Sequence, residues 1–154
     1  MSYYKFINKK TFELNSKEIL AIFNFIQNEW KIGKKIIMKL LSNYHYDDVH
    51  FFVYKNNTIV GYANLIKKNN LRKIYFIDYL IIKKIFKKKK IGSNLLNYIN
   101  SFLAKKKLLV YLHCLPHIQK FYSHNFWSIL TSKDYLFYYL KKHNHICMKF
   151  KLNF

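Results

Sequence analysis

The sequence predicts an α/β fold, a single domain with a mixed central sheet flanked by helices. Helical and extended patterns alternate along most of the 154 residues, which is about the length of one domain. Apolar residues make up 51% of the chain, enough for a sizeable core. With three glycines and one proline, no stretch has the composition of a linker. We therefore expect residues 1–154 to form one domain.

Two helices are expected first, over residues 15–30 and 33–44, with a break near Gly33. Asn15 can cap the first helix together with Glu18, which lies three residues further on. The apolar residues of this helix recur at helical spacing: Ile19, Ile22, Phe23 and Ile26.

Three strands should follow. Residues 49–68 are typical of two strands joined by a turn at Lys55-Asn56-Asn57-Thr58. Residues 72–84, reached through Asn69-Asn70, are rich in Ile, Tyr and Phe. They become apolar on both faces toward their end, as expected of a central strand.

A longer helix is predicted over residues 93–107, opened by Gly92 and Ser93. The lysines at 105–107 suit the negative C-terminal end of the helix dipole. Its buried stripe is predicted to hold Leu95, Leu96, Ile99 and Phe102.

The C-terminal part should add three strands and one short helix. Residues 108–114 predict a strand, and proline at the start of 116–125 suits the first turn of a helix. Residues 126–130 and 145–154 are expected to be closing strands. Together with the earlier elements, these give the predicted order α-α-β-β-β-α-β-α-β-β.

Two observations indicate a cytoplasmic protein without a membrane partner. Residues 1–20 lack the apolar run of a signal peptide, and the longest apolar stretches are too short to span a bilayer. The only cysteines, Cys114 and Cys147, are expected to be buried free thiols.

The formal net charge of +21 suggests an anionic partner. An alternative explanation is genome composition, because the abundance of Lys, Asn, Ile, Phe and Tyr is the bias expected of an AT-rich genome. Part of the lysine excess would then have no function. The distribution is more informative, because no Asp or Glu lies between Asp78 and Asp134. This segment should attract anions, and a basic nucleic-acid-binding module is one alternative.

Four consecutive lysines, residues 87–90, separate a predicted strand from a predicted helix N-terminus. Free backbone N–H groups and the helix dipole favour an anion there, and Ser93 can add a hydroxyl. The shape suits a pyrophosphate better than duplex DNA, because a major-groove reader carries its basic residues along a helix face. The alternative is an ordinary solvated loop.

The lysine loop resembles motif A of the GNAT superfamily of acetyl-CoA-dependent N-acetyltransferases, a strand, then [RQ]-x-x-G-x-[GA], then a helix. Here the motif would run from Lys87 to Gly92. Lys87 replaces the usual Arg or Gln, and Lys90 replaces the first Gly. The side chain of Lys90 must then lie over the pyrophosphate or point away from it.

A second stretch, residues 117–127, resembles that superfamily's pattern a-x-x-F-Y-x-x-x-G-F. Phe121, Tyr122 and Phe126 match it. Asn125 replaces the glycine, and we expect it to adopt the left-handed conformation at the helix end. The two motifs come in the right order, and the resemblance covers about residues 14–130.

A finer resemblance is to the branch of N-terminal acetyltransferases that modifies processed actin. It rests on three short features: "IQNEW" near the end of the first helix, "FYSHNFW", and Asp78 five positions before the first basic pair.

The resemblance implies acetyl-CoA as co-substrate. Backbone groups of the strand would hold the pantetheine and the thioester carbonyl, and the loop amides would hold the pyrophosphate. The implied cofactor-binding residues are Leu80, Ile81, Ile82, Lys87, Lys88, Lys89, Lys90, Ile91, Gly92 and Ser93.

The resemblance also implies catalytic groups. Tyr122 would be the general acid for the leaving thiolate, since a phenol carries its proton at neutral pH; the alternative for this Tyr is packing. Asp78, a lone carboxylate in an apolar strand, is the candidate base, acting through water, or else a structural Asp paired with a lysine. His113 is an alternative base or a structural histidine.

Trp30, Lys34 and Lys35 should border the acceptor cleft, by the same resemblance. The alternatives are core packing for Trp30 and a solvated helix face for the lysines. No metal site is expected, because His113, Cys114 and His117 lack a second ligand pair at zinc spacing.

The resemblance implies an N-acetyltransferase that uses acetyl-CoA, and together with the charge it implies that the acceptor is the N-terminal amine of an acidic protein or peptide such as actin. A strongly cationic surface should repel basic acceptors and attract acidic ones. Two alternatives stay open: the nucleic-acid-binding module, and a CoA-binding protein without turnover, suggested by Lys90 and Asn125 at motif glycines.

Overall fold

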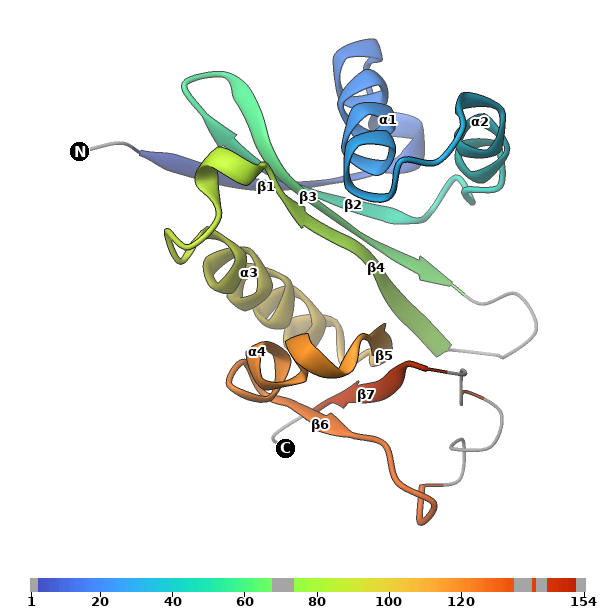
Figure 1. Cartoon of the computed structure of the whole chain (residues 1–154), viewed down its shortest axis with the longest axis vertical. Coiled ribbons are helices and arrows are strands. Elements are labelled where there is room, and N and C mark those ends of the chain that lie inside the picture. Colours follow the sequence, from blue (N-terminus) through green and yellow to red (C-terminus); the bar gives the residue numbers. More distant parts are fainter. Residues whose placement is uncertain (1–2, 68–73, 135–139, 141–143, 152–154) are drawn as a thin grey trace.

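The computed structural model of the chain contains one seven-stranded mixed sheet with helices on both faces (Figure 1). It describes residues 3–67, 74–134, 140 and 144–151. The strands are Tyr4–Lys10 (β1), Val49–Lys55 (β2), Thr58–Lys67 (β3), Ile74–Ile82 (β4), Leu109–Cys114 (β5), Trp127–Ile129 (β6) and Ile146–Phe150 (β7). The α-helices of the described residues are Ser16–Trp30 (α1), Lys34–Ser42 (α2), Ile91–Lys106 (α3) and Gln119–Ser123 (α4), with short 3-10 helices at Thr11–Glu13 (η1), Lys84–Phe86 (η2) and Pro116–Ile118 (η3).

The sheet order is β1-β2-β3-β4-β5-β7-β6. All neighbours are antiparallel except β4 and β5, which are parallel and are joined through α3. The predicted α/β class is therefore confirmed.

Two cores cover the two faces of the sheet. On one face, α3 and α4 pack over a core that includes Leu95, Leu96 and Ile99. On the other face, α1 and α2 cover a core built around Ile22, Phe25, Ile26 and Ile37. A third, smaller cluster contains buried side chains of β4, β5 and β7. Both cysteines are buried free thiols, as expected. In the described ranges, no helix combines the length and apolarity needed to cross a bilayer.

The first strand was not predicted. β1 pairs along its whole length with β2 and forms the edge of the sheet. Its sequence, YKFINKK, is only half-buried and rich in lysine, as suits an edge strand, and this composition concealed it.

Two details of the predicted helices are also corrected. Of the apolar residues that recur at helical spacing in the first helix, Ile19 is 46% exposed, whereas Phe25 joins Ile22 and Ile26 on the buried face. α3 begins at Ile91, two residues earlier than expected, and Lys90 precedes it as the cap.

Other local predictions are confirmed. The Asn15 side chain accepts a hydrogen bond from the Glu18 amide at 3.0 Å, and the Glu18 carboxylate accepts one from the Asn15 amide. Asn56 and Asn57 form the hairpin turn with positive φ values of 46° and 62°. The predicted Asn69-Asn70 connection lies outside the described residues.

Candidate active site

The sheet opens between β4 and β5. The two strands pair from Ile74 with Leu109 to Ile77 with Leu112, while β4 continues to Ile82. β4 also bulges: the two-residue step from Tyr62 to Asn64 in β3 spans three residues in β4, and Tyr79 has a φ of 55°. The C-terminal half of β4 therefore departs from its parallel neighbour and borders a pocket.

The pocket beside β4 has a volume of about 500 Å³. It joins β4, the lysine loop, the start of α3 and α4, segments that are far apart in the sequence. The lining residues are Glu29, Leu80, Ile82, Lys87, Lys88, Lys90, Gly92, Ser93, Ile118, Phe121 and Tyr122. We refer to it as the cofactor pocket, after the residues implied for cofactor binding that line it.

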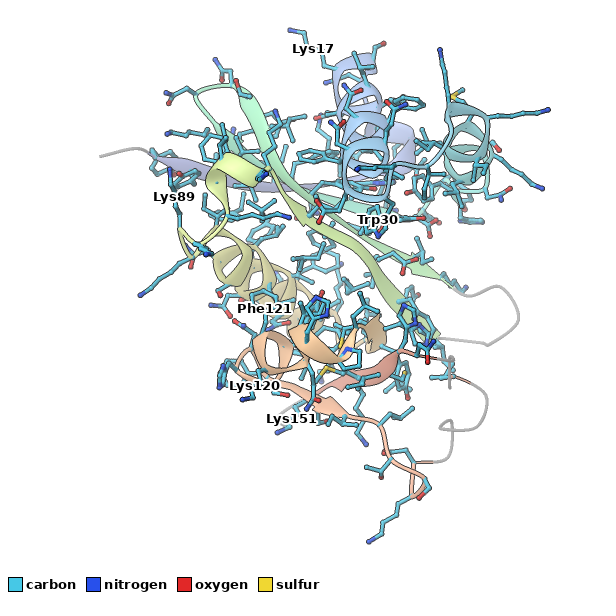
Figure 2. The ribbon with its side chains drawn as sticks, in the orientation of Figure 1. Lys17, Trp30, Lys89, Lys120, Phe121 and Lys151 are labelled. Carbon is cyan, nitrogen blue, oxygen red and sulfur yellow. The ribbon has the colours of Figure 1, made fainter. Side chains whose placement is uncertain are left out.

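Most of the residues implied for cofactor binding line this pocket, but three do not. The Ile81 side chain packs in the core under α1, on the other face of the sheet. Ile91 is 1% exposed and lies in the core under α3. The Lys89 amine lies 5.6 Å from the centre of the Phe86 ring, and Figure 2 shows Lys89 on the lysine loop. Any role of these three in binding would therefore rest on their backbone groups.

The lysine loop turns through two left-handed residues, and one of them, Lys90, stands where the motif places glycine. Lys88 and Lys90 have φ values of 64° and 58°, a conformation that costs a non-glycine residue about 1 kcal/mol. The turn brings the first amides of α3 to the pocket, where their free N–H groups and the helix dipole favour an anion. Glycine is therefore not required for this loop to form.

An ion pair ties the loop to α1. The Lys87 ammonium lies 3.0 Å from a carboxylate oxygen of Glu29, and both side chains are well exposed. Exposed pairs of this kind contribute little to stability, so an anion in the pocket can compete for Lys87.

Gly92 provides a direct test of the cofactor pocket. A Cβ atom there would lie 3.6 Å from the Phe121 ring and 3.7 Å from Ile82, which are ordinary contacts. We expect Gly92→Glu to leave the melting temperature close to wild type, because glutamate favours helix and its charge suits a helix N-terminus. It should raise the calorimetric Kd for CoA at least tenfold, because the added negative charge repels the phosphates of CoA.

Gly33→Glu is the matched control, because it makes the same change of charge where a Cβ meets nothing within 4 Å. If both variants bound CoA as the wild type does, Gly92 would not border the bound phosphates.

Tyr122 enters the pocket from α4. It is 8% exposed and packs in the core under α3 and α4. Burial raises the pKa of its phenol, and the nearby Cys114 and Asp78 raise it further. The side chain therefore holds its proton at neutral pH, as a general acid must.

Asn125 acts differently from the prediction. The left-handed residue after α4 is Phe126, with a φ of 68°, and Asn125 has no positive φ. Instead, its side-chain amide donates a hydrogen bond of 2.6 Å to the Phe121 carbonyl, and its own carbonyl accepts one of 2.8 Å from Asn100. These bonds hold the end of α4 against α3, and the left-handed residue follows one position later.

Neither Asp78 nor His113 belongs to the core under α3, and neither lines the cofactor pocket. Asp78 pairs with Asn64 across β3 and β4 and is half-buried. The His113 ring stacks on Phe76 with ring centres 5.3 Å apart, and its Nε2 lies 2.7 Å from the Leu140 carbonyl. Since a carbonyl only accepts, Nε2 carries the hydrogen in this contact and only Nδ1 can act as a base.

Trp30 lies at the end of α1 nearest β4 (Figure 2), with its ring edge-on to Tyr79 at 5.3 Å. It is 46% exposed and is therefore not a core residue. Lys34 and Lys35 are exposed in the first turn of α2. The three residues thus surround the connection between α1 and α2.

Sequence reasoning did not single out a buried polar cluster on the α1 face of the sheet. The ring nitrogens of fully buried His50 lie 2.8 Å from the Tyr62 hydroxyl and 2.9 Å from the Thr11 hydroxyl. Asn64, also fully buried, lies between His50 and Asp78 in the sheet register. Neither the side-chain oxygen nor the side-chain nitrogen of Asn64 has a hydrogen-bond partner among the described residues. No spacing in the sequence indicates this cluster, because it joins three strands.

His50 should make the fold sensitive to acid. Burial lowers its pKa to about 4, against about 6.5 in an unfolded chain. Between these values the unfolded state binds more protons, so stability is complete above pH 6.5 and is lost as the pH falls toward 4. We expect His50 to reduce the free energy of unfolding by roughly 3 kcal/mol over this interval. Denaturant titrations of wild type and His50→Gln at several pH values measure this loss of stability. The same dependence of the unfolding free energy on pH in the two proteins would contradict the prediction.

In the ranges 3–67, 74–134, 140 and 144–151, no group of three or more His, Cys, Asp or Glu is placed to hold a metal ion.

Comparison with known proteins identifies a family for the chain. The sequence profile of the acetyltransferase (GNAT) family matches residues 18–127. No curated protein matches the chain.

Solved structures share the fold at low identity. An acyl-CoA N-acyltransferase from Pseudomonas aeruginosa has a TM-score of 0.76 and 15% identity, over 97% of this chain and 100% of that one. Tetrahymena GCN5 has a TM-score of 0.73 and 13% identity, over 98% and 96%. The ribosomal-protein-S18-alanine N-acetyltransferase of Escherichia coli has a TM-score of 0.70 and 12% identity, over 97% and 96%.

The profile match spans most of the chain, including the lysine loop and the Phe121-Tyr122 pair, and the structural matches cover nearly all of it. The chain therefore belongs to the acetyltransferase (GNAT) family, whose acyl donor is acetyl-CoA.

Proposed function

We propose that this protein transfers the acetyl group of acetyl-CoA to the N-terminal amine of an acidic protein or peptide, with processed actin as the acceptor suggested by sequence resemblance. One observation carries the catalytic part of the proposal: the cofactor pocket brings the lysine loop and the start of α3 to the same hollow as Tyr122.

The residues of the pocket fit the donor. The loop lysines and the first amides of α3 would hold its phosphates, and the backbone of β4 around Leu80 would hold the pantetheine arm. Acetyl-CoA supplies a thioester, whose carbonyl carbon the acceptor amine attacks. A backbone N–H of bulged β4 would steady the charge that develops on the carbonyl oxygen.

Tyr122 would donate its proton to the sulfur as the carbon–sulfur bond breaks. The attacking amine must also lose a proton, because an N-terminal amine with a pKa of about 8 is mostly charged at pH 7. Asp78 would accept this proton through water, and the buried amide of Asn64 beside it could bind such a water. His113, through Nδ1, is the alternative base.

Charge supports an acidic acceptor. The net charge of +21 disfavours basic partners such as polyamines and histone tails. Trp30, Lys34 and Lys35 would face the acceptor at the connection between α1 and α2. The fold is compatible with a protein acceptor, since one similar structure is named for acetylating an alanine of ribosomal protein S18.

The test is a transfer assay with two peptide sets, one with acidic N-termini and one rich in lysine. Intact-mass and fragment spectra give the gain of one acetyl group and its position. We expect the gain on the N-terminal amine of the acidic peptides. A gain only on lysine side chains would refute the acceptor, and no gain with CoA still raising the melting temperature would indicate binding without turnover.

A further inference from the structure

A second hollow, of about 880 Å³, lies between α1, the β2–β3 hairpin and the end of β4. Its size falls within the range of roughly 300–1,000 Å³ typical of ligand pockets. We call it the α1 groove. Its lining residues are Asn15, Lys17, Leu20, Ala21, Asn24, Phe25, Asn28, Glu29, Tyr54, Asn57, Thr58, Ile59, Ile81, Ile82, Lys83, Lys84 and Lys87. Ile81, Ile82 and Lys87 are also among the residues implied for donor binding, but no role has been assigned above to the α1 and hairpin residues that form most of the lining.

The floor and the rim of the groove differ in chemistry. Buried apolar side chains such as Phe25, Ile59 and Ile81 form the floor. At the edge, Leu20 is an apolar side chain that is 59% exposed. Four asparagines also line the groove. The Asn15 side chain caps α1, and the other three are Asn24, Asn28 and Asn57. Asparagine amides both donate and accept hydrogen bonds, so they can pair with a peptide backbone.

The charge of the groove is positive. Four lysines line it against one carboxylate, and that carboxylate, Glu29, is paired with Lys87. Lys17, Lys83 and Lys84 are exposed and come from opposite walls, α1 and the end of β4. An occupant with several negative charges would complement both walls.

The groove adjoins the cofactor pocket. Glu29, Ile82 and Lys87 line both hollows. A polypeptide whose first residue lies at the cofactor pocket can therefore continue past Glu29 and along α1. In Figure 2, Trp30 marks the β4 end of this helix and Lys17 marks its far end.

We infer that the α1 groove binds an extended acidic segment of the acceptor polypeptide, downstream of the residue whose amine is acetylated. The lysines would pair with its carboxylates, the asparagines with its backbone, and Leu20 with an apolar side chain. This inference rests on the proposed function, because it assigns a binding surface to the same acceptor.

The test compares two double variants with equal changes of charge. Lys17→Glu/Lys84→Glu reverses the two walls of the groove at exposed positions. Lys133→Glu/Lys151→Glu makes the same change at exposed residues outside it. Figure 2 shows Lys151 beside β6 and β7, far from Lys17. Melting temperature and CoA affinity should match the wild type in both variants.

Binding is measured first, by fluorescence anisotropy with an acidic peptide whose N-terminus is already acetylated. This readout does not depend on transfer. We expect the groove variant to bind about tenfold more weakly than the wild type, and the control variant to bind nearly as well. Equal affinities for the groove variant and the control would overturn the inference.

Kinetics separate this inference from the proposed function. With an acidic peptide that has a free N-terminus, KM should rise about tenfold in the groove variant while kcat stays nearly unchanged. If the wild type acetylates this peptide and the groove variant has the same KM, the function stands and the inference fails. If no peptide is acetylated, the function fails and the anisotropy result alone decides the groove.

A competition experiment tests the class of occupant. A single-stranded oligonucleotide with the same charge should displace the peptide poorly at about 200 mM salt, where non-specific phosphate contacts weaken. Displacement as strong as that by unlabelled peptide would show a general polyanion site and contradict the assignment.

Discussion

Replacing Tyr122 with phenylalanine should lower the turnover number for acetyl transfer about a hundredfold or more, the usual contribution of a positioned general acid. The phenol is buried and its raised pKa keeps the proton in place. Phenylalanine keeps the ring that packs edge-on against Phe121 at 5.1 Å. We therefore expect the melting temperature and the Kd for acetyl-CoA to stay close to wild type, so that only the chemical step is affected.

Tyr98→Phe is the matched control. The Tyr98 hydroxyl donates a hydrogen bond of 2.8 Å to Asn8, and Tyr98 does not line the cofactor pocket. Loss of the Tyr98 hydroxyl should leave kcat unchanged within about twofold. If Tyr122→Phe were as active as Tyr98→Phe, Tyr122 would be only a packing residue.

Asp78→Asn should reduce kcat/KM about a hundredfold at pH 7, where the acceptor amine is mostly protonated. The asparagine cannot accept the amine proton. The deficit should shrink as the pH rises above about 8, because the amine then loses its proton to solvent. Steady-state rates between pH 6 and 10 measure this recovery.

The same profile for His113→Gln separates the two candidate bases. If that variant alone showed a deficit that alkali relieves, the base would be His113. An Asp78→Asn deficit that is constant with pH and accompanied by a lower melting temperature would make Asp78 a structural residue. That result would exclude Asp78 as the base.

The sequence predicted local structure well where a few neighbouring residues determine the backbone conformation. The Asn15–Glu18 capping box, the Asn56-Asn57 turn and the apolar central strand were all predicted, and each depends on residues close in the chain. β1 was missed because an edge strand needs neither a long apolar run nor full burial.

The candidate site was predictable as a set of motifs but not as a surface. The lysine loop and Tyr122 were identified separately, and only the fold places them at one pocket. The bulge at Tyr79 decides which side chains of β4 face this pocket, so Leu80 and Ile82 line it and Ile81 does not. Asn64 and His50 lay outside any motif, because their proximity depends on strand register.

Asn125 shows how a motif can match while its geometry differs. The expectation of a left-handed residue came from the glycine that usually occupies this position. Instead, the Asn125 side chain donates a hydrogen bond to the Phe121 carbonyl at the end of α4, and the left-handed residue is Phe126.

The central claim is that the sulfur of the bound donor lies beside Tyr122, and a disulfide trap tests it directly. A Tyr122→Cys variant is treated with CoA disulfide, so that the new thiolate attacks one sulfur, forms a mixed disulfide and releases one CoA thiol. The native thiols should stay inert, because burial raises the pKa of Cys114 to about 11 and that of Cys147 to about 12. Ser123→Cys, on the next and more exposed residue of α4, is the control.

Intact-protein mass spectrometry follows the gain of one CoA over time. We predict that position 122 reacts faster than position 123 in spite of its burial, and that excess acetyl-CoA slows the reaction only at 122. Faster labelling at 123, with no protection by acetyl-CoA at either position, would contradict this placement of the donor.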